Sequence, residues 1–150
     1  MKSVFNPADV ASLIKRIEKL HPHSQPRWGR MNAAQMLAHC NVTYEMVYDD
    51  KHAEPNIFLR LFLRIFVKNT VVSEAPYQKN LQTAPAFLIR EDKKFVVERK
   101  RLITYIQKTL DLGGAYFDGK KSLSFGQLTE AEWNNMFYKH LDHHLNQFGE

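Results

Sequence analysis

The chain has 150 residues, of which 44% are hydrophobic and 25% charged, and its formal net charge is +5. Its one cysteine excludes an intrachain disulfide and a zinc site built from several thiolates. Its 21 Lys and Arg residues are dispersed rather than gathered into a stripe, which argues against a dedicated nucleic-acid surface.

The first two predicted helices are marked by capping residues at their N-termini. Asn6 followed by Pro7 predicts a helix start, and apolar residues at helical spacing continue to about Pro22. The helix should end there, because the residue before a proline disfavours helical geometry. After a proline-containing connection, Asn32 with a glutamine three residues later predicts a capping box, and the second helix should end near Asp49.

An apolar segment follows at residues 57–67. Arg60, Arg64 and Lys68 recur every fourth residue, which places them on one face of a helix. The segment is too short to cross a bilayer, since a span needs about 20 apolar residues. We predict a buried helix or a dimer-interface helix, with attachment to a membrane surface as the alternative.

The second half of the chain contains a loop and two further predicted helices. Residues 70–90 lack a clear period and predict a long loop with a short helical turn, of the kind that often covers a site. A helix should start near Glu91 and stop at Gly113-Gly114. After another loop, Thr129 with a glutamate three residues later predicts the capping box of a last helix ending at Gly149.

These elements predict an all-α fold that forms one domain over residues 1–150. Gly and Pro are scarce, with six of each, which favours long helices over a turn-rich sheet sandwich. The N-terminal residues have no apolar run resembling a signal peptide, so a cytoplasmic location is the expectation.

Two histidines on the last predicted helix are the strongest chemical signal. His140 and His144 lie about 40° apart on the helix, inside its apolar stripe between Phe137 and Leu145. Burying them without partners would cost about 1–3 kcal/mol each, which a bound metal would offset. His39, at the border of the second helix's apolar stripe, is the best candidate for a third ligand. Three His ligands plus a water describe an open zinc site, and imidazoles also suit nickel, iron or copper.

Other polar residues are weaker candidates. The alternative for the histidines themselves is that they are hydrogen-bonded core residues. His143 lies at the edge of the stripe, and Gln147 either orients a water or substrate or makes a helix-end hydrogen bond. Cys40 points into an apolar stripe and is expected to be a buried, inert thiol. Glu45 has a helical phase that points away from the site, which leaves no convincing general base.

Three segments carry a family resemblance. They are residues 28–40 (WGRMNAAQMLAHC), residues 125–133 (FGQLTEAEW) and residues 140–149 (HLDHHLNQFG). With these segments in this order, the sequence resembles the DinB-like family, in its branch of uncharacterised proteins.

The resemblance implies a four-helix bundle of up-down-down-up type, with an extra short helix or long loop in the middle, often as a homodimer. It implies a divalent metal (Zn, Ni or Fe) held by His39, His140 and His144. Known relatives include bacillithiol S-transferases and mycothiol-dependent maleylpyruvate isomerases. The leading hypothesis is therefore a metal-dependent thiol S-transferase that uses a low-molecular-weight thiol and a small-molecule substrate. A metal-dependent hydrolase, or a non-enzymatic binding or stress protein with a structural metal, are the alternatives.

Overall fold

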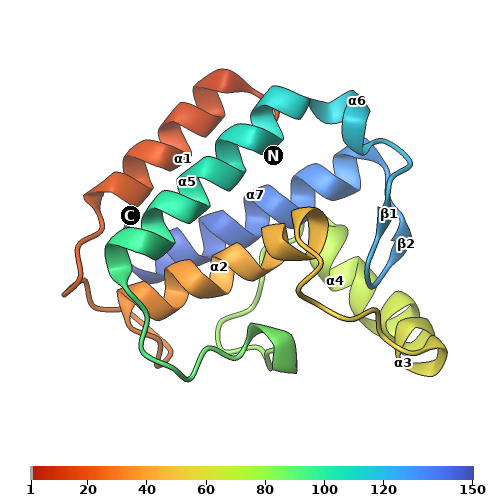
Figure 1. Cartoon of the computed structure of the whole chain (residues 1–150), viewed down its shortest axis with the longest axis horizontal. Coiled ribbons are helices and arrows are strands. Elements are labelled where there is room, and N and C mark those ends of the chain that lie inside the picture. Colours follow the sequence, from red (N-terminus) through yellow and green to blue (C-terminus); the bar gives the residue numbers. More distant parts are fainter. Residues whose placement is uncertain (1) are drawn as a thin grey trace.

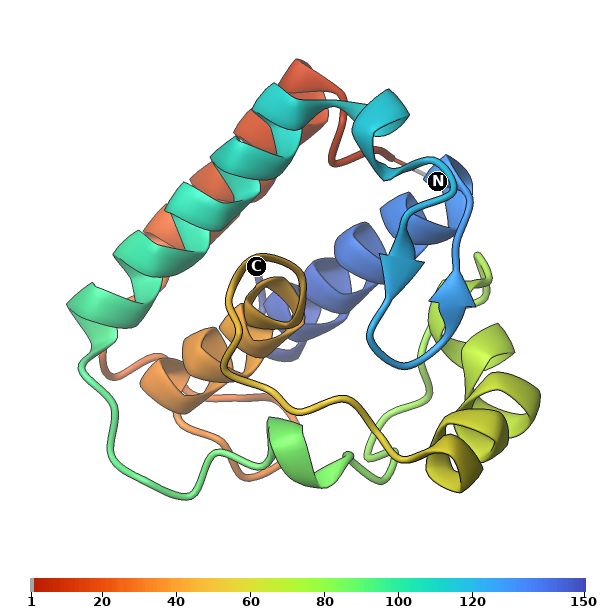
Figure 2. The same cartoon turned by 45° about the vertical axis from the view of Figure 1, so that its right-hand side comes forward.

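The computed structural model describes residues 2–150, and long helices dominate it (Figure 1). Each long helix packs on two others: α1 on α5 and α7, and α2 on α5 and α7. Both views show α1 and α5 side by side (Figures 1 and 2). The long helices are α1 (Pro7–Lys19), α2 (Ala33–Tyr48), α5 (Phe95–Leu112) and α7 (Glu130–Gln147). The predicted all-α class is confirmed, while the up-down-down-up order stays a prediction.

The predicted caps set the helix ends. The Asn6 side chain accepts hydrogen bonds from two backbone N–H groups of the first turn of α1. Asn32 and Thr129 begin α2 and α7, each within a reciprocal capping box. Because these side chains satisfy backbone donors that the helix itself cannot, they fix where α2 and α7 start.

The core lies where the four helices meet. Apolar side chains of all four are almost completely buried, as the helical spacing predicts. They include Leu13, Ile17, Leu37, Ile106 and Phe137. The faces of α2 and α7 that carry this core continue into the polar cluster described below.

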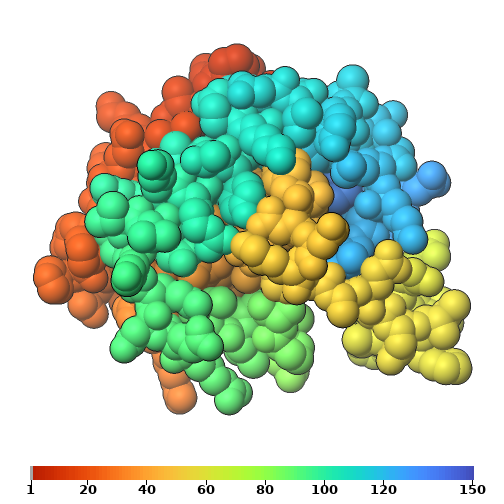
Figure 3. All heavy atoms as spheres, viewed as in Figure 1, coloured from red at the N-terminus to blue at the C-terminus, as the bar shows by residue number. Residues whose placement is uncertain are grey.

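The middle of the chain forms an arm that projects from the bundle. It consists of α3 (Ile57–Phe62), a π-helical turn (Leu63–Val67) and α4 (Lys68–Val72). The arm extends away from the long helices (Figures 1 and 3). The prediction of a buried helix here is wrong, because Phe58 and Phe66 are 82% and 67% exposed. An apolar run predicts that its side chains are shielded from water. It does not reveal whether they are covered by the same chain or by another molecule.

Residues 73–94 connect the arm to α5 as a loop with one 3₁₀ turn, Pro85–Phe87. The loop predicted over residues 70–90 is largely confirmed, but residues 70–72 belong to α4. Helix α5 begins at Phe95, four residues after the predicted Glu91. The Lys94 side chain makes no capping hydrogen bond, and Glu91 pairs with Lys93 instead of starting a helix. Sequence periodicity without a cap therefore placed this boundary too early.

A β-hairpin lies where a plain loop was predicted. Beyond the short helix α6 (Gly114–Phe117), strand β1 (Lys121–Ser122) pairs antiparallel with β2 (Gly126–Gln127). Two residues per strand are too few for a period-2 pattern to be recognised. Among residues 2–150, no helix combines the length and apolarity needed to cross a bilayer.

Candidate metal centre

Helices α2 and α7 bring the three predicted histidines together. One ring nitrogen each from His39, His140 and His144 lies within 4.8 Å of the others. The ring centroids are 4.9 Å apart for His39 and His140, 4.5 Å for His39 and His144, and 4.8 Å for the α7 pair. His39 and His144 are 5% and 7% exposed. The three side chains can form a metal site inside the bundle.

The tautomer of His39 follows from its partner. Its Nδ1 lies 2.9 Å from the backbone carbonyl oxygen of Phe87, in the 3₁₀ turn. Because a carbonyl only accepts, Nδ1 carries the proton and donates it. Nε2 of His39 therefore presents a lone pair to the other two histidines.

His144 is held in the same way by Gln147. The Gln147 Nε2 donates to the Trp28 carbonyl at 2.7 Å, so its Oε1 faces the other way and accepts from His144 Nδ1 at 2.8 Å. Gly29 makes room for this link, since a Cβ at its φ of +82° would lie 2.5 Å from Gln147 Nε2. The Trp28-Gly29 motif thus helps to orient a histidine more than 100 positions away. Gln147 makes a hydrogen bond near the helix end, and that bond positions His144.

His140 keeps a choice of tautomer. Its Nδ1 lies 2.9 Å from Thr43 Oγ1, and a hydroxyl can either donate or accept. Its Nε2 lies 2.9 Å from His39 Nε2, which carries no proton. Without a cation, His140 Nε2 must therefore donate to His39. With a cation, the proton can move to Nδ1 and be donated to Thr43, which leaves three lone pairs facing one point.

Burial keeps the imidazoles neutral. It lowers the pKa of His39, brings the pKa of His144 to about 3, and holds that of His140 well below its ordinary value. Because a metal binds the unprotonated nitrogen, groups with lowered pKa values lose little affinity to competing protons near neutral pH. No Asp or Glu joins the cluster within residues 2–150. The donor set is therefore uncharged.

Aromatic rings surround the three histidines. The Phe87 ring lies 5.3 Å from His39 and 5.9 Å from His140, measured between centroids. Half-buried His143 contacts Tyr77 and Trp28 edge-on, at 5.6 and 5.7 Å. Phe87 and Tyr77 both belong to the segment that connects the arm to α5. The prediction that this loop covers a site agrees with these contacts, although no sequence signal identified either ring.

Two lysines lie against the faces of these surrounding aromatic rings. Lys79 Nζ lies 4.4 Å from the Trp28 ring centroid, and Lys139 Nζ lies 4.6 Å from that of Tyr77. Lys139 is buried and donates to the Thr70 carbonyl at 2.8 Å and to the Ser73 carbonyl. Burial lowers its pKa to about 8. The rim of the site is therefore aromatic and cationic.

Two other polar residues of α2 lie outside the cluster. Glu45 forms an ion pair with Arg101 and a hydrogen bond with the His52 ring. Burial opposes its ionisation, but the hydrogen bonds from these two residues lower its pKa overall. Cys40 is buried, and burial strongly raises the pKa of its thiol, which makes it unreactive. Both observations agree with the sequence-based interpretation.

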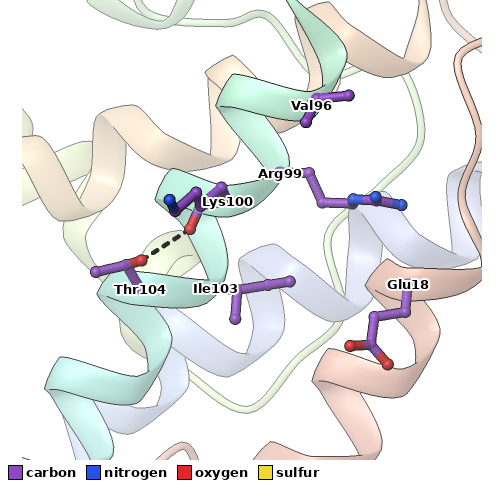
Figure 4. Close-up of a pocket in the computed structure, with 6 residues that line it drawn as sticks. All are labelled: Glu18, Val96, Arg99, Lys100, Ile103 and Thr104. Atoms are coloured by element: carbon purple, nitrogen blue, oxygen red, sulfur yellow. Dashed lines mark hydrogen bonds between the residues drawn. The ribbon is translucent and has the colours of Figure 1, made fainter.

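Surface hollows lie elsewhere, along α5. The hollow drawn in Figure 4 is formed by α5 and Glu18 of α1, and a second one lies beside it on α5. In the first, the Thr104 hydroxyl is bonded to the Lys100 carbonyl of its own helix, and the charged lining residues are Glu18, Arg99 and Lys100. Neither hollow includes a histidine, so the candidate chemistry is not on this face.

Comparison with known protein families identifies the family of this chain. A family described as "Protein of unknown function (DUF1569)" matches residues 5–150. The chain belongs to this family. No curated protein and no solved structure matches it. The family description carries no activity, and the DinB-like resemblance stays a prediction.

The Gln147 link can be tested by metal affinity. We expect Gln147→Leu to weaken metal binding about 10- to 100-fold, as is usual when a group that orients a ligand is removed. Gly29→Ala should act in the same way, because its Cβ displaces the Gln147 amide. Competition with a chromogenic chelator measures both. Gln107→Leu, on the exposed face of α5, is the matched control. Unchanged affinity in Gln147→Leu would remove this residue from the centre.

Proposed function

We propose that the protein binds one divalent metal ion through His39, His140 and His144 and is a metal-dependent thiol S-transferase acting on a small molecule. The observation that carries the proposal is the convergence of three imidazole nitrogens, each with its other nitrogen bonded to a different partner. Hydrogen-bonded core histidines would also have such partners, but they would not need their remaining nitrogens to converge.

The number of ligands supports a catalytic site over a structural one. Three protein ligands leave one position of a tetrahedral ion for a water or substrate, whereas structural zinc sites usually have four. A divalent cation held by these three residues would lower the pKa of a thiol at that position and so supply a thiolate near neutral pH. Because the donor set is uncharged, the ion would keep its full positive charge toward the thiol.

The surrounding residues suit this reaction. The thiol proton passes to solvent, sulfur forms a bond to an electrophilic carbon, and the leaving group departs with the electron pair of its bond. No step requires a carboxylate base, and none joins the histidine cluster within residues 2–150. Lys79, at the aromatic rim, is positioned to attract an anionic thiol or substrate. The DinB-like resemblance, whose known members include thiol transferases, points the same way.

Hydrolysis is the second candidate, and His143 favours it. Its ring centroid lies 5.0 Å from that of His144, and burial lowers the pKa of the half-buried imidazole, which leaves it neutral at pH 7. A neutral imidazole beside an activated water is a suitable general base.

The experiment separates the two reactions. We expect the cobalt-substituted protein to change its visible spectrum when cysteine or glutathione is titrated, because sulfur enters the coordination sphere. We also expect His143→Gln to keep this response and to retain transfer of the thiol to a chlorodinitrobenzene acceptor. If neither thiol changes the visible spectrum and His143→Gln abolishes ester hydrolysis, the protein is a hydrolase. If neither activity is detected in the metal-loaded protein, the metal is structural and the transferase proposal is wrong.

A further inference from the structure

The exposed side of the arm is a continuous apolar stripe, which we call the arm face. Its six members follow one another at one- and three-residue steps, so they line one side of the helix. Each is more than half exposed, and Phe62 and Phe66 contact each other with ring centroids 5.0 Å apart. The arm face consists of Ile57, Phe58, Leu61, Phe62, Ile65 and Phe66.

The three basic side chains of the arm contact other parts of their own chain. Arg60 pairs with Glu54 at 3.2 Å, and Lys68 pairs with Glu132 of α7 at 2.8 Å. The Arg64 guanidinium lies against the hairpin turn at Gly126. An ordinary surface helix has the reverse arrangement, with apolar residues inward and charges outward. The arm therefore presents to solvent the side that a helix normally buries.

The base of the arm is fixed to α7. The Asn135 side chain donates to the Val72 carbonyl at 2.9 Å, and Lys139 donates to the Thr70 carbonyl. These bonds satisfy carbonyls at the end of α4, where a helix has no N–H donors of its own. The arm is therefore anchored to the bundle, and the arm face is held in one orientation.

We propose that the arm face is the interface with a second copy of this chain, packed arm against arm about a two-fold axis. Such an interface uses the same patch on both copies, so one apolar surface is sufficient. The exposed fractions of the six side chains are together equivalent to nearly four whole side chains, and at about 150–250 Å² each the arm face offers about 570–960 Å². That range includes the roughly 800 Å² per partner of a standard stable interface.

A membrane surface fits this face less well. Helices that lie on anionic lipid have free Lys and Arg beside their apolar stripe. In this arm Arg60 and Lys68 are already paired within the chain, and Arg64 lies against the hairpin. The charges therefore favour an apolar protein partner.

The solution mass tests the proposal. We expect the full chain at about 50 μM to have twice the 17.6-kDa chain mass by light scattering or sedimentation. Phe58→Asp and Phe66→Asp should each convert it to the monomer, because two carboxylates would be buried per symmetric interface. Neither side chain packs in the core, so helicity and metal content should be unchanged. Val96→Asp on α5, where the side chain is 66% exposed and thus close to the 67% of Phe66, is the matched control and should remain dimeric.

Crosslinking locates the contact. Leu61→Cys should give a covalent dimer with a short bismaleimide, while the wild-type chain should give none because its one cysteine is buried. A monomeric wild-type protein at this concentration would overturn the proposal. A dimer that persists in both aspartate variants would do so too. Cosedimentation of a monomer with phosphatidylcholine–phosphatidylglycerol vesicles, lost in Phe58→Asp, would assign the arm face to a membrane instead.

Discussion

Replacing His144 by alanine should abolish stoichiometric metal binding and leave a folded helical protein. Loss of a ligand should weaken binding by more than the 10- to 100-fold that follows loss of an orienting group. The apolar contacts of α7 remain, because Phe137, Leu141 and Leu145 stay buried in the core. Elemental analysis of the purified variant, with circular dichroism as the test of folding, measures both expectations.

The matched control is His23→Ala, which removes an exposed histidine outside the cluster. It should retain one metal ion per chain. If His144→Ala also retains a full equivalent of metal, His144 is not a ligand, and the convergence of the three rings has another cause.

The metal-free protein should lose stability as the pH falls below 6.5. His39, His140, His143 and His144 all have pKa values lowered by burial, so the unfolded chain binds more protons than the folded one. The free energy of unfolding therefore decreases as the pH is lowered, and the decrease begins near the pKa of about 6.5 that histidine has in the unfolded chain. Each histidine that stays neutral contributes about 1.5 kcal/mol between pH 6.5 and 5, so the total is several kcal/mol.

Urea unfolding of chelator-treated protein at intervals from pH 7.5 to 5 measures this dependence. The window isolates the histidines, because carboxylates with lowered pKa values, such as Glu45 and Glu132, lose their contribution only below about pH 4.5. His144→Gln should have a slope smaller by one proton. A free energy of unfolding that stays constant across this range would mean that the buried imidazoles are not neutral in the folded state.

Local signals in the sequence determined most of the helix boundaries. Asn6, Asn32 and Thr129 act through atoms within three residues of themselves, so their effect can be predicted without knowing the rest of the fold. The one-turn spacing of His140 and His144 is equally local. That His39 faces them depends on how α2 packs against α7. Its place at the border of the apolar stripe makes it a candidate third ligand, and the family resemblance implies the same three residues.

The parts that sequence reasoning missed depend on contacts between distant segments. Phe87 and Tyr77 belong to a segment without periodicity, and they acquire a role only because that segment folds over the histidines. Helical phase places His143 at the edge of the stripe and does not reveal which other segments contact it. The buried Lys139 depends likewise on the carbonyls at the end of α4.

The Phe87 carbonyl links access to the candidate metal site with the orientation of the His39 ring. The segment that covers the site also accepts the proton of His39, so it is both the cover and a support for one ligand. A molecule that entered by pushing the 3₁₀ turn aside would release the imidazole from its fixed orientation. Any ion that holds the three rings in place must, by reciprocity of linked equilibria, also favour the closed position of the turn. Metal binding and displacement of the 3₁₀ turn therefore oppose each other.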